Sequence, residues 1–523
     1  MKRLFPLVLL LASCSDEKPG FSEYALPATS RPAPPKQPEG AESRRAESSG
    51  EILPLEAPPA AGEATVDDRK QLDSLGYDPA VRKNAERQRG EQEWGGRIFL
   101  SNDDSMSLAS AQRVLWSVGE GRRVASAELR PHELLNYFTF ETPPVPRGQT
   151  FGITASAVRT DAGLSVALAV TGATPARRPL DLTLVLDRSG SMAEEGRMDF
   201  LKRGLVQMLD RLHAGDRVDV VLFDDEVSVA KRGFVVGQDD LDDLRLLVEE
   251  IQPRGATDLD AGLEAAYKLA RSRPRDAARD ARVVVVTDAK LTAGDVDPAR
   301  VTEIARAFDE SGIRLAAVGV GRDFDDDVLQ RLTEKGRGAY VYLGSEKVVD
   351  RVFGAGFDAL VHIVADDVRF ALDLPDSLGM RRFYGEEMST VAADVVPVSF
   401  HAGTTQVFLQ DLAIAPSGIA SKAPLVLDVT WRDPLNGNQR TQRWSSTVGE
   451  VLAADRANVT KARALMAWTD LARVGDHGCH DEKREWTSRA RAFGGDTETR
   501  YLDGLVAGWC REPERSTAIA EAE

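Results

Sequence analysis

The stretch that decides the fold is Leu182–Ser191, with the sequence LTLVLDRSGS. It starts as an apolar run and ends in one carboxylate, Asp187, and two hydroxyls, Ser189 and Ser191. An apolar run of this length is typical of a strand buried on both faces of a parallel sheet. We therefore expect the polar residues to lie on the loop that leads from this strand into the first helix.

The same alternation continues across residues 179–361. Short apolar runs are followed by amphipathic stretches with helical spacing, which is typical of a mainly parallel sheet covered by helices on both faces. We predict an α/β fold with a doubly wound, Rossmann-like sheet. The apolar runs lie at 182–186, 218–223, 283–287 and 315–320, and the amphipathic stretches at 198–212, 259–270, 301–308 and 328–332.

Two later segments add polar residues at predicted strand ends. Thr257 lies in Gly255-Ala256-Thr257-Asp258, and Asp288 follows the apolar run that ends at Thr287. Loops at the carboxyl ends of strands converge where the strand order reverses, so we expect Thr257 and Asp288 to approach the first loop. Because every candidate ligand atom is an oxygen, the site favours a hard divalent cation, Mg²⁺ first and Mn²⁺ as a substitute.

The order Asp187, Ser189, Ser191, Thr257 and Asp288 resembles the metal-ion-dependent adhesion site of von Willebrand factor type A (VWA) domains. The resemblance covers essentially the whole central block. It implies that Ser189 and Ser191 coordinate the metal directly, Thr257 directly or through water, and Asp187 and Asp288 mainly through water. Neutral hydroxyl ligands leave the cation electrophilic, so an acidic residue of a protein partner would complete the shell. Ala289 departs from the family, which usually has glycine there.

An enzymatic alternative begins from Asp187 as a nucleophile attacking phosphorus in a metal-dependent phosphohydrolase. Enzymes similar to haloacid dehalogenase place a second aspartate two residues later as general acid, where this chain has Ser189. The sequence has no P-loop, G-x-S-x-G or H-E-x-x-H motif. We therefore expect a binding protein and no enzyme, although each polar residue taken alone would also suit a helix cap or a turn.

The first residues have the layout of a secretory signal: Lys2 and Arg3, the apolar segment Leu4–Leu11, then small residues up to Cys14. Leu11-Ala12-Ser13-Cys14 resembles the lipobox of bacterial lipoproteins. The resemblance implies cleavage of a signal peptide and a diacylated Cys14, with Ser15 favouring the outer membrane. An ordinary signal peptide or a buried N-terminal helix is the alternative. We expect a lipid-anchored protein of the bacterial cell envelope.

Composition and charge exclude other partners and a spanning topology. The formal net charge is −17, and no cluster of Lys and Arg interleaved with aromatics offsets it, which argues against nucleic acid. No later apolar run is long enough to span a bilayer, so we expect membrane contact through the lipid anchor alone.

The flanking segments divide the rest of the chain. We assign 1–14 to the lipoprotein signal peptide, 15–91 to a disordered tether rich in Pro, Ala and Glu, and 92–148 to a helical flanking region. Alternating apolar residues predict β-sandwich strands at 149–178 and again at 362–446, on both sides of the VWA block at 179–361. Residues 447–523 read as a C-terminal helical region. The flanking and C-terminal regions resemble those of exported bacterial VWA proteins, the latter a domain of unknown function.

Two smaller motifs each allow a structural or a metal-binding interpretation. His132-Glu133, within PHELLNYF at 131–138, lacks the second histidine of a metalloprotease helix, so we expect a core-supporting helix. Cys479 and Cys510 favour a disulfide in an oxidising compartment. The alternative is a metal site that adds His477 and His480, although the spacing matches no standard zinc module.

We hypothesise a cell-envelope protein that binds a protein partner through the metal. The alternative from another class is a structural envelope scaffold whose metal site is vestigial.

Overall fold

The computed structural model describes residues 94–510, except for 123, 125–128, 275, 277, 293–297, 322–327, 330–331, 334–338, 344–345 and 476–478. All of these belong to one compact unit, residues 65–523. The predicted signal peptide with Cys14 and the tether at 15–91 lie outside the described residues, as do His477 and residues 511–523.

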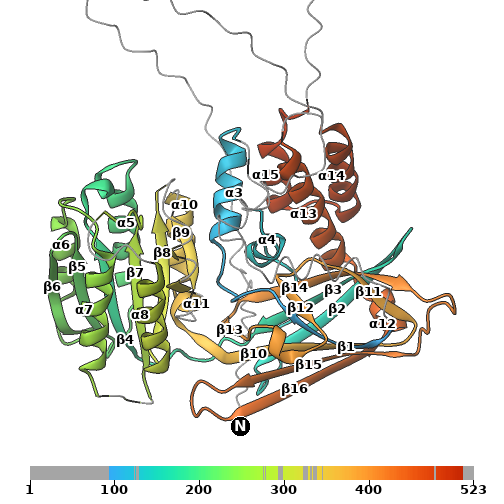
Figure 1. Ribbon diagram of the computed structural model, residues 1–523, viewed down its shortest axis with the longest axis horizontal. Coiled ribbons are helices and arrows are strands. Elements are labelled where there is room, and N and C mark those ends of the chain that lie inside the picture. The colour runs from blue at the N-terminus through green and yellow to red at the C-terminus, as the bar shows by residue number, and fades with distance from the viewer. Residues whose placement is uncertain are drawn as a thin grey trace, which may run out of the picture. The chain divides into compact units, whose positions relative to one another are not determined.

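The central sheet has six strands in the order β6-β5-β4-β7-β8-β9 (Figure 1). All neighbouring pairs are parallel except β5 with the edge strand β6. The chain first runs outward from β4, then returns to place β7 on the other side of β4, so the strand order reverses between β4 and β7. The strands are β4 (Leu180–Asp187), β5 (Arg217–Phe223), β6 (Val227–Val235), β7 (Asp280–Thr287), β8 (Arg314–Val320) and β9 (Tyr340–Leu343).

Helices cover both faces of this sheet. Leu182, Leu184 and Leu186 of β4 pack with α5 (Arg197–Leu209) and α6 (Leu241–Glu250). Val185 points to the opposite face, where it packs with α7 (Leu259–Arg271) and α8 (Pro298–Glu310). Alternate residues of one strand thus enter two separate cores, and the predicted doubly wound class is confirmed. The block also contains η2 (Gly190–Ala193), α10 (Glu346–Val349), a π-helical segment (Asp350–Ala355) and α11 (Phe357–Val361).

A two-sheet β-sandwich accompanies the central block (Figure 1). One sheet has the order β12-β1-β10-β15-β16, with β13 also paired to β10, and the other has the order β11-β14-β3-β2. Strand β3, which precedes the central block, pairs with β14, which follows it. The strands are β1 (Gly96–Ser101), β2 (Phe151–Thr160), β3 (Gly163–Gly172), β10 (Ile363–Leu374), β11 (Leu378–Phe383), β12 (Glu387–Ser389), β13 (Val398–His401), β14 (Thr405–Ile414), β15 (Pro424–Arg432) and β16 (Gln439–Thr447).

The region predicted as helical at 92–148 differs from the structure at its start. Residues Gly96–Ser101 form β1, which lies between β10 and β12 in the first sheet. The strand is short and its burial does not alternate cleanly, so the sequence carries no period-2 signal. Two helices follow, α3 (Ala109–Gly119) and α4 (Pro131–Tyr137). A single turn, η4 (Ala392–Asp394), precedes β13.

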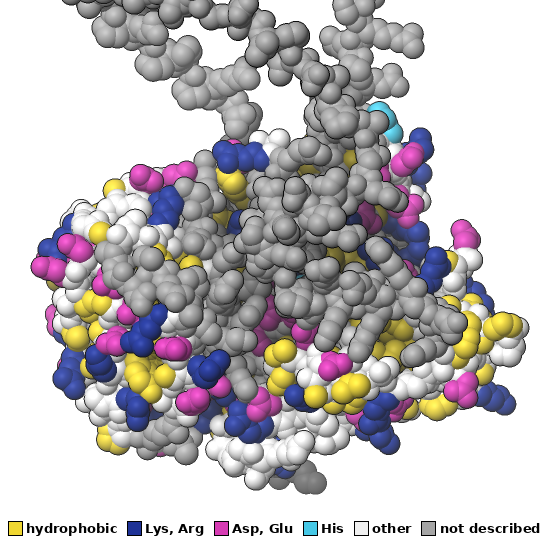
Figure 2. All heavy atoms as spheres, in the orientation of Figure 1, with side chains coloured by type: hydrophobic (Ala, Val, Ile, Leu, Met, Phe, Trp, Pro, Cys, Tyr) yellow, Lys and Arg dark blue, Asp and Glu magenta, His cyan; other side chains and the backbone are white. Residues whose placement is uncertain are grey.

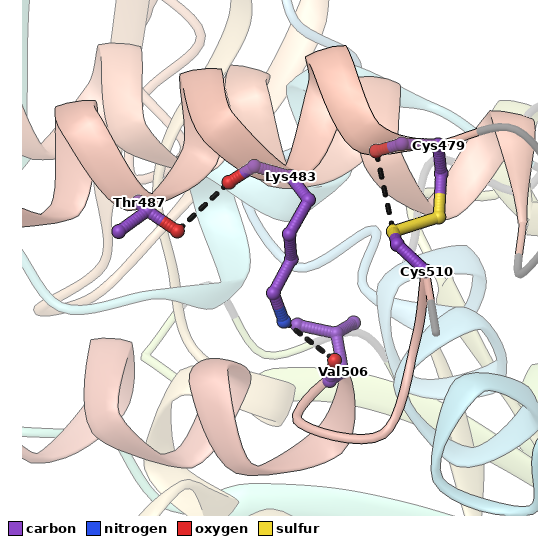
Figure 3. Close-up of a disulfide and its surroundings, with 5 residues drawn as sticks. All are labelled: Cys479, Lys483, Thr487, Val506 and Cys510. Carbon is purple, nitrogen blue, oxygen red and sulfur yellow. Dashed lines mark hydrogen bonds between the residues drawn. A yellow bond between two sulfur atoms is a disulfide. The ribbon is translucent and has the colours of Figure 1, made fainter. Parts of the chain in front are cut away.

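The C-terminal part is helical, with α12 (Val448–Ala453), α13 (Ala457–Val474), α14 (His480–Phe493) and α15 (Thr497–Leu505). A disulfide joins Cys479, just before α14, to Cys510, beyond α15 (Figure 3). Lys483 Nζ, in α14, donates a hydrogen bond to the carbonyl of Val506, just after α15, at 2.6 Å, so it joins the same two segments as the disulfide. Because both sulfurs are in the disulfide, neither supplies a thiolate to the alternative metal site with His477 and His480.

The face of the molecule drawn in Figure 2 is mixed in charge. Acidic and basic side chains are interspersed over this face. Among the described helices, none is both long enough and apolar enough to cross a membrane.

A buried histidine connects the central block to the sandwich. Nδ1–H of His401, in β13, donates to the carbonyl of Ala359, in α11, at 2.6 Å. Burial lowers the pKa of His401 to about 3. The folded protein therefore holds this imidazole neutral at a pH where the unfolded chain takes up a proton.

We predict that this histidine destabilises the fold in mild acid. With an ordinary pKa near 6.5 when unfolded, it should remove about 2 kcal/mol of unfolding free energy between pH 7 and pH 5. His401→Asn keeps a side-chain N–H for Ala359 but does not titrate, so its stability should fall less over that range. Urea unfolding of both proteins at the two pH values measures the difference, with exposed His213→Asn as the matched control. Equal losses in parent and His401→Asn would contradict the assignment.

Candidate metal centre

The five residues predicted to hold a metal lie on three loops at one edge of the central sheet. Asp187 is the last residue of β4, and Ser189 and Ser191 follow it. Thr257 immediately precedes the N-cap residue of α7, and Asp288 directly follows β7. Since β4 and β7 are parallel neighbours, their carboxyl ends meet where the strand order reverses.

The first loop is organised around Asp187. One oxygen of its carboxylate accepts the backbone N–H of Ser189 at 2.7 Å, and the other accepts the hydroxyl of Thr287 at the end of β7. Ser189 Oγ lies 3.1 Å from Ser191 Oγ. The carboxylate thus ties together the ends of two strands and sets the turn that brings the two serine hydroxyls side by side.

Backbone hydrogen bonds bring the second loop to the first. Gly190 N donates to the carbonyl of Gly255 at 3.0 Å, and Arg254 N donates to the carbonyl of Arg188 at 2.6 Å. The buried Asp224 reinforces this contact, because Arg188 and Arg254 each place Nε 2.7 Å from the same carboxylate oxygen. Burial opposes ionisation of Asp224, but the hydrogen bond from Arg254 and both positive charges leave its pKa below the usual value.

The third loop is bound to the second through two threonines. Thr257 N donates to Thr292 Oγ1 at 2.9 Å, and Thr292 N donates to the carbonyl of Thr257 at 3.3 Å. Asp288 lies at the start of this third loop. The three loops therefore form one hydrogen-bonded unit that holds all five predicted residues.

A buried arginine that the sequence analysis missed lies at this centre. Arg197 Nη1 is 2.8 Å from Asp288 Oδ2, and it also donates to the carbonyl of Ser191 at 2.8 Å. The Arg197 side chain is 1% exposed and that of Asp288 is 0% exposed. A Cβ at Gly321 would lie 2.2 Å from Arg197 Nε, so only glycine leaves room for this side chain.

The electrostatics of the centre favour a bound cation. Burial raises the pKa of Asp187 to about 6, and the negative charge of Asp288 adds to the shift, while hydrogen bonds from Thr287 and Ser189 oppose it. Two carboxylates therefore share a buried site in which Arg197 supplies one positive charge. The remaining donors, two serine hydroxyls and one threonine hydroxyl, are oxygens, and this set fits Mg²⁺ or Mn²⁺. Four of the five residues are buried and Ser191 is half-buried, so Ser191 is the most exposed of the five.

Ala289 has a left-handed backbone conformation, with φ of +51°. Glycine adopts this conformation without the contact between Cβ and the carbonyl that an alanine makes. The strain accounts for the preference for glycine that the resemblance implies here. Ala289 N still donates to Thr287 Oγ1 at 2.8 Å, so the alanine remains part of the hydrogen-bonded unit.

Two signals in the sequence point to the missed residues. Arg197 is the first residue of α5, where a positive charge opposes the helix dipole and therefore needs a reason. Thr287 is the one hydroxyl at the end of a strand of valines, Val283–Val286. Neither signal identifies its partner, because that requires the relative placement of β4 and β7.

Residues 180–342 match the family model of the von Willebrand factor type A domain. The match runs from the first residue of β4 into β9, so it spans the strands of the central sheet.

Curated relatives match over part of this chain. The uncharacterized protein YfbK of Escherichia coli is 23% identical over 194 residues, which cover 37% of this chain and 33% of that protein. The uncharacterized protein sll0103 of Synechocystis is 24% identical over 204 residues, which cover 38% of this chain and 46% of that one. This chain therefore spans less than half the length of either relative.

Among solved structures, the von Willebrand factor type A protein from Catenulispora acidiphila is similar, with a TM-score of 0.45 and 13% sequence identity. The match covers 70% of this chain and 91% of that protein.

We predict that Arg197→Met destabilises the metal-free protein by about 3–5 kcal/mol, because Asp288 then stays buried without its counter-charge. Added Mg²⁺ should stabilise this variant more than it stabilises the parent, since the cation replaces the missing positive charge. Urea unfolding with EDTA and with Mg²⁺ measures both effects. Arg203→Met, on the same helix but 41% exposed, is the control. An equal gain from Mg²⁺ in parent and Arg197→Met would refute competition between Arg197 and the metal.

Proposed function

We propose that this protein binds a protein partner through a divalent cation held by Asp187, Ser189, Ser191, Thr257 and Asp288. The observation that supports this best is the convergence of these oxygen donors on three loops that hydrogen bonds hold together. Mg²⁺ suits such a set and retains water in its shell, and Mn²⁺ can replace it. A carboxylate of the partner would take the place of one water, so the site recognises an acidic residue and catalyses no reaction.

The predicted lipid anchor determines where this binding takes place. We propose that Cys14 is diacylated and that residues 15–91 act as a tether, which would hold the VWA domain at the cell envelope, most simply at the outer membrane. The support is the order of Lys2, Arg3, the apolar segment and Cys14 in the sequence. Labelling of cells with an alkyne fatty acid tests this: Cys14→Ser should lose the label that the parent carries.

The scaffold alternative has one observation in its favour. Arg197 already supplies a positive charge to Asp288, as it would in a centre that has lost its metal. If that were so, function would reside in the β-sandwich and the C-terminal helices, and binding of a partner would be insensitive to chelation.

Metal binding separates the two hypotheses. We predict that calorimetry with Mg²⁺ or Mn²⁺ finds one site per chain and that Ser189→Ala weakens it at least about tenfold, because a direct ligand is lost. Asp187→Ala should abolish it. Ser228→Ala, an exposed serine on β6, is the matched control and should bind as the parent does. A parent that takes up neither ion would contradict the proposal.

The partner test uses the same variants. Crosslinking in the native envelope should trap a partner in Mg²⁺ with the parent and with Ser228→Ala, and lose it with EDTA or with Ser189→Ala. An unchanged set of crosslinked proteins after chelation would favour the scaffold.

A further inference from the structure

Outside the VWA domain, three chemically suitable side chains meet from distant parts of the sequence. Asp103 follows β1, His132 is the second residue of α4, and Glu386 directly precedes β12. One ring nitrogen of His132 and one carboxylate oxygen from each of Asp103 and Glu386 all lie within 4.8 Å of one another. We propose that these residues form a second metal site, which takes a transition-metal ion such as Zn²⁺. The site is independent of the proposed function of the VWA domain.

His132 is the residue that most requires a ligand. It is 6% exposed, and within the described part of the chain its Nε2 has no hydrogen-bond partner. Leaving a buried nitrogen without a hydrogen-bond partner destabilises the folded chain, and a bond to a metal would offset that loss.

The adjacent Glu133, unlike His132 Nε2, has hydrogen-bond partners for its side chain. Its two oxygens accept hydrogen bonds from Ser110 N at 2.8 Å and Arg130 Nη1 at 2.9 Å, so it is a structural residue of the α3–α4 contact. The core-supporting helix expected here is α4, whose Leu134 and Leu135 lie in a buried hydrophobic cluster. His132 points to a different group of residues, those of the sandwich edge.

Local backbone structure positions both carboxylates, those of Asp103 and Glu386. Asp103 has a left-handed φ of +63°, and its Oδ1 accepts Asp104 N at 2.6 Å. Glu386 N donates to the carbonyl of Ser101 at 3.0 Å, which extends the pairing of β12 with β1. A Cβ at Gly385 would lie 2.3 Å from Asn102 Oδ1, so only glycine allows the chain before Glu386 to approach this closely.

Two further oxygens near these residues lack partners. Asn102 Oδ1 and Asn136 Oδ1 are both buried and, among the residues that the structure describes, accept no hydrogen bond. Asn136 lies one turn after His132 on α4, and its Nδ2 donates to the carbonyl of Asn102 at 3.2 Å. Such oxygens are suited to accept hydrogen bonds from water molecules that complete a metal shell.

The donor set selects the type of metal. An imidazole nitrogen with two carboxylates suits Zn²⁺ and similar ions, whereas Mg²⁺ and Ca²⁺ prefer oxygen alone. His132 is buried but Asp103 and Glu386 are partly exposed, which gives an ion a route of entry. A bound ion would clamp α4 to the β1–β12 edge of the sandwich.

Zinc titration of the full chain tests the proposal. After EDTA treatment and exchange into excess Mg²⁺, which occupies the all-oxygen centre, calorimetry should find one tightly bound Zn²⁺ per chain. His132→Gln and Asp103→Asn should each weaken it by roughly 100-fold or more, since each removes a direct ligand. Asp103→Asn retains an oxygen for Asp104 N, so it tests the site even if His132→Gln folds poorly.

Two controls keep this test separate from that of the VWA centre. Ser189→Ala should leave Zn²⁺ binding unchanged, and so should His213→Gln, which replaces an exposed histidine. Absence of Zn²⁺ uptake by the parent, or uptake unchanged in both His132→Gln and Asp103→Asn, would overturn the proposal without affecting that for Mg²⁺.

Discussion

The central constraint on this structure is the burial of two carboxylates, Asp187 and Asp288, where β4 and β7 end side by side. Two like charges out of water are costly unless hydrogen bonds and positive charge surround them. Thr287 and the backbone of Ser189 supply the hydrogen bonds to Asp187, and Arg197 supplies a charge to Asp288. The three loops take the geometry that provides these hydrogen bonds and this charge to the two carboxylates.

The same constraint explains why the centre is suited to a cation. Arg197 compensates one carboxylate, and Asp187 remains with a raised pKa, so the site gains from another positive charge. The serine and threonine hydroxyls are neutral and add no compensating charge of their own. A metal ion and Arg197 would therefore both compensate the charge of the buried carboxylates. Whether the metal binds in addition to Arg197 decides between a binding site and a structural remnant.

Much of the VWA block could be predicted, because its signals are local. Each parallel strand is an apolar run, and Asp187, Thr257 and Asp288 stand at the ends of predicted elements. By contrast, β1 pairs with β10, so Gly96 lies opposite Leu374, and six residues with little alternation cannot reveal such a distant partner. In the sequence, Arg197 has the pattern of a surface residue on an amphipathic helix. Only the folded structure shows that its side chain is buried. Asp103 and Glu386 likewise come together only through the pairing of β1 with β12, and His132 reaches them from α4.

Anomalous diffraction from crystals of the Mn²⁺-loaded protein would test the account of the VWA centre most directly. We expect a peak at coordination distance, about 2.1 Å, from the hydroxyl oxygens of both Ser189 and Ser191, with Asp187 and Asp288 in the surrounding shell. Mn²⁺-soaked crystals without such a peak, with Arg197 still paired to Asp288, would contradict it.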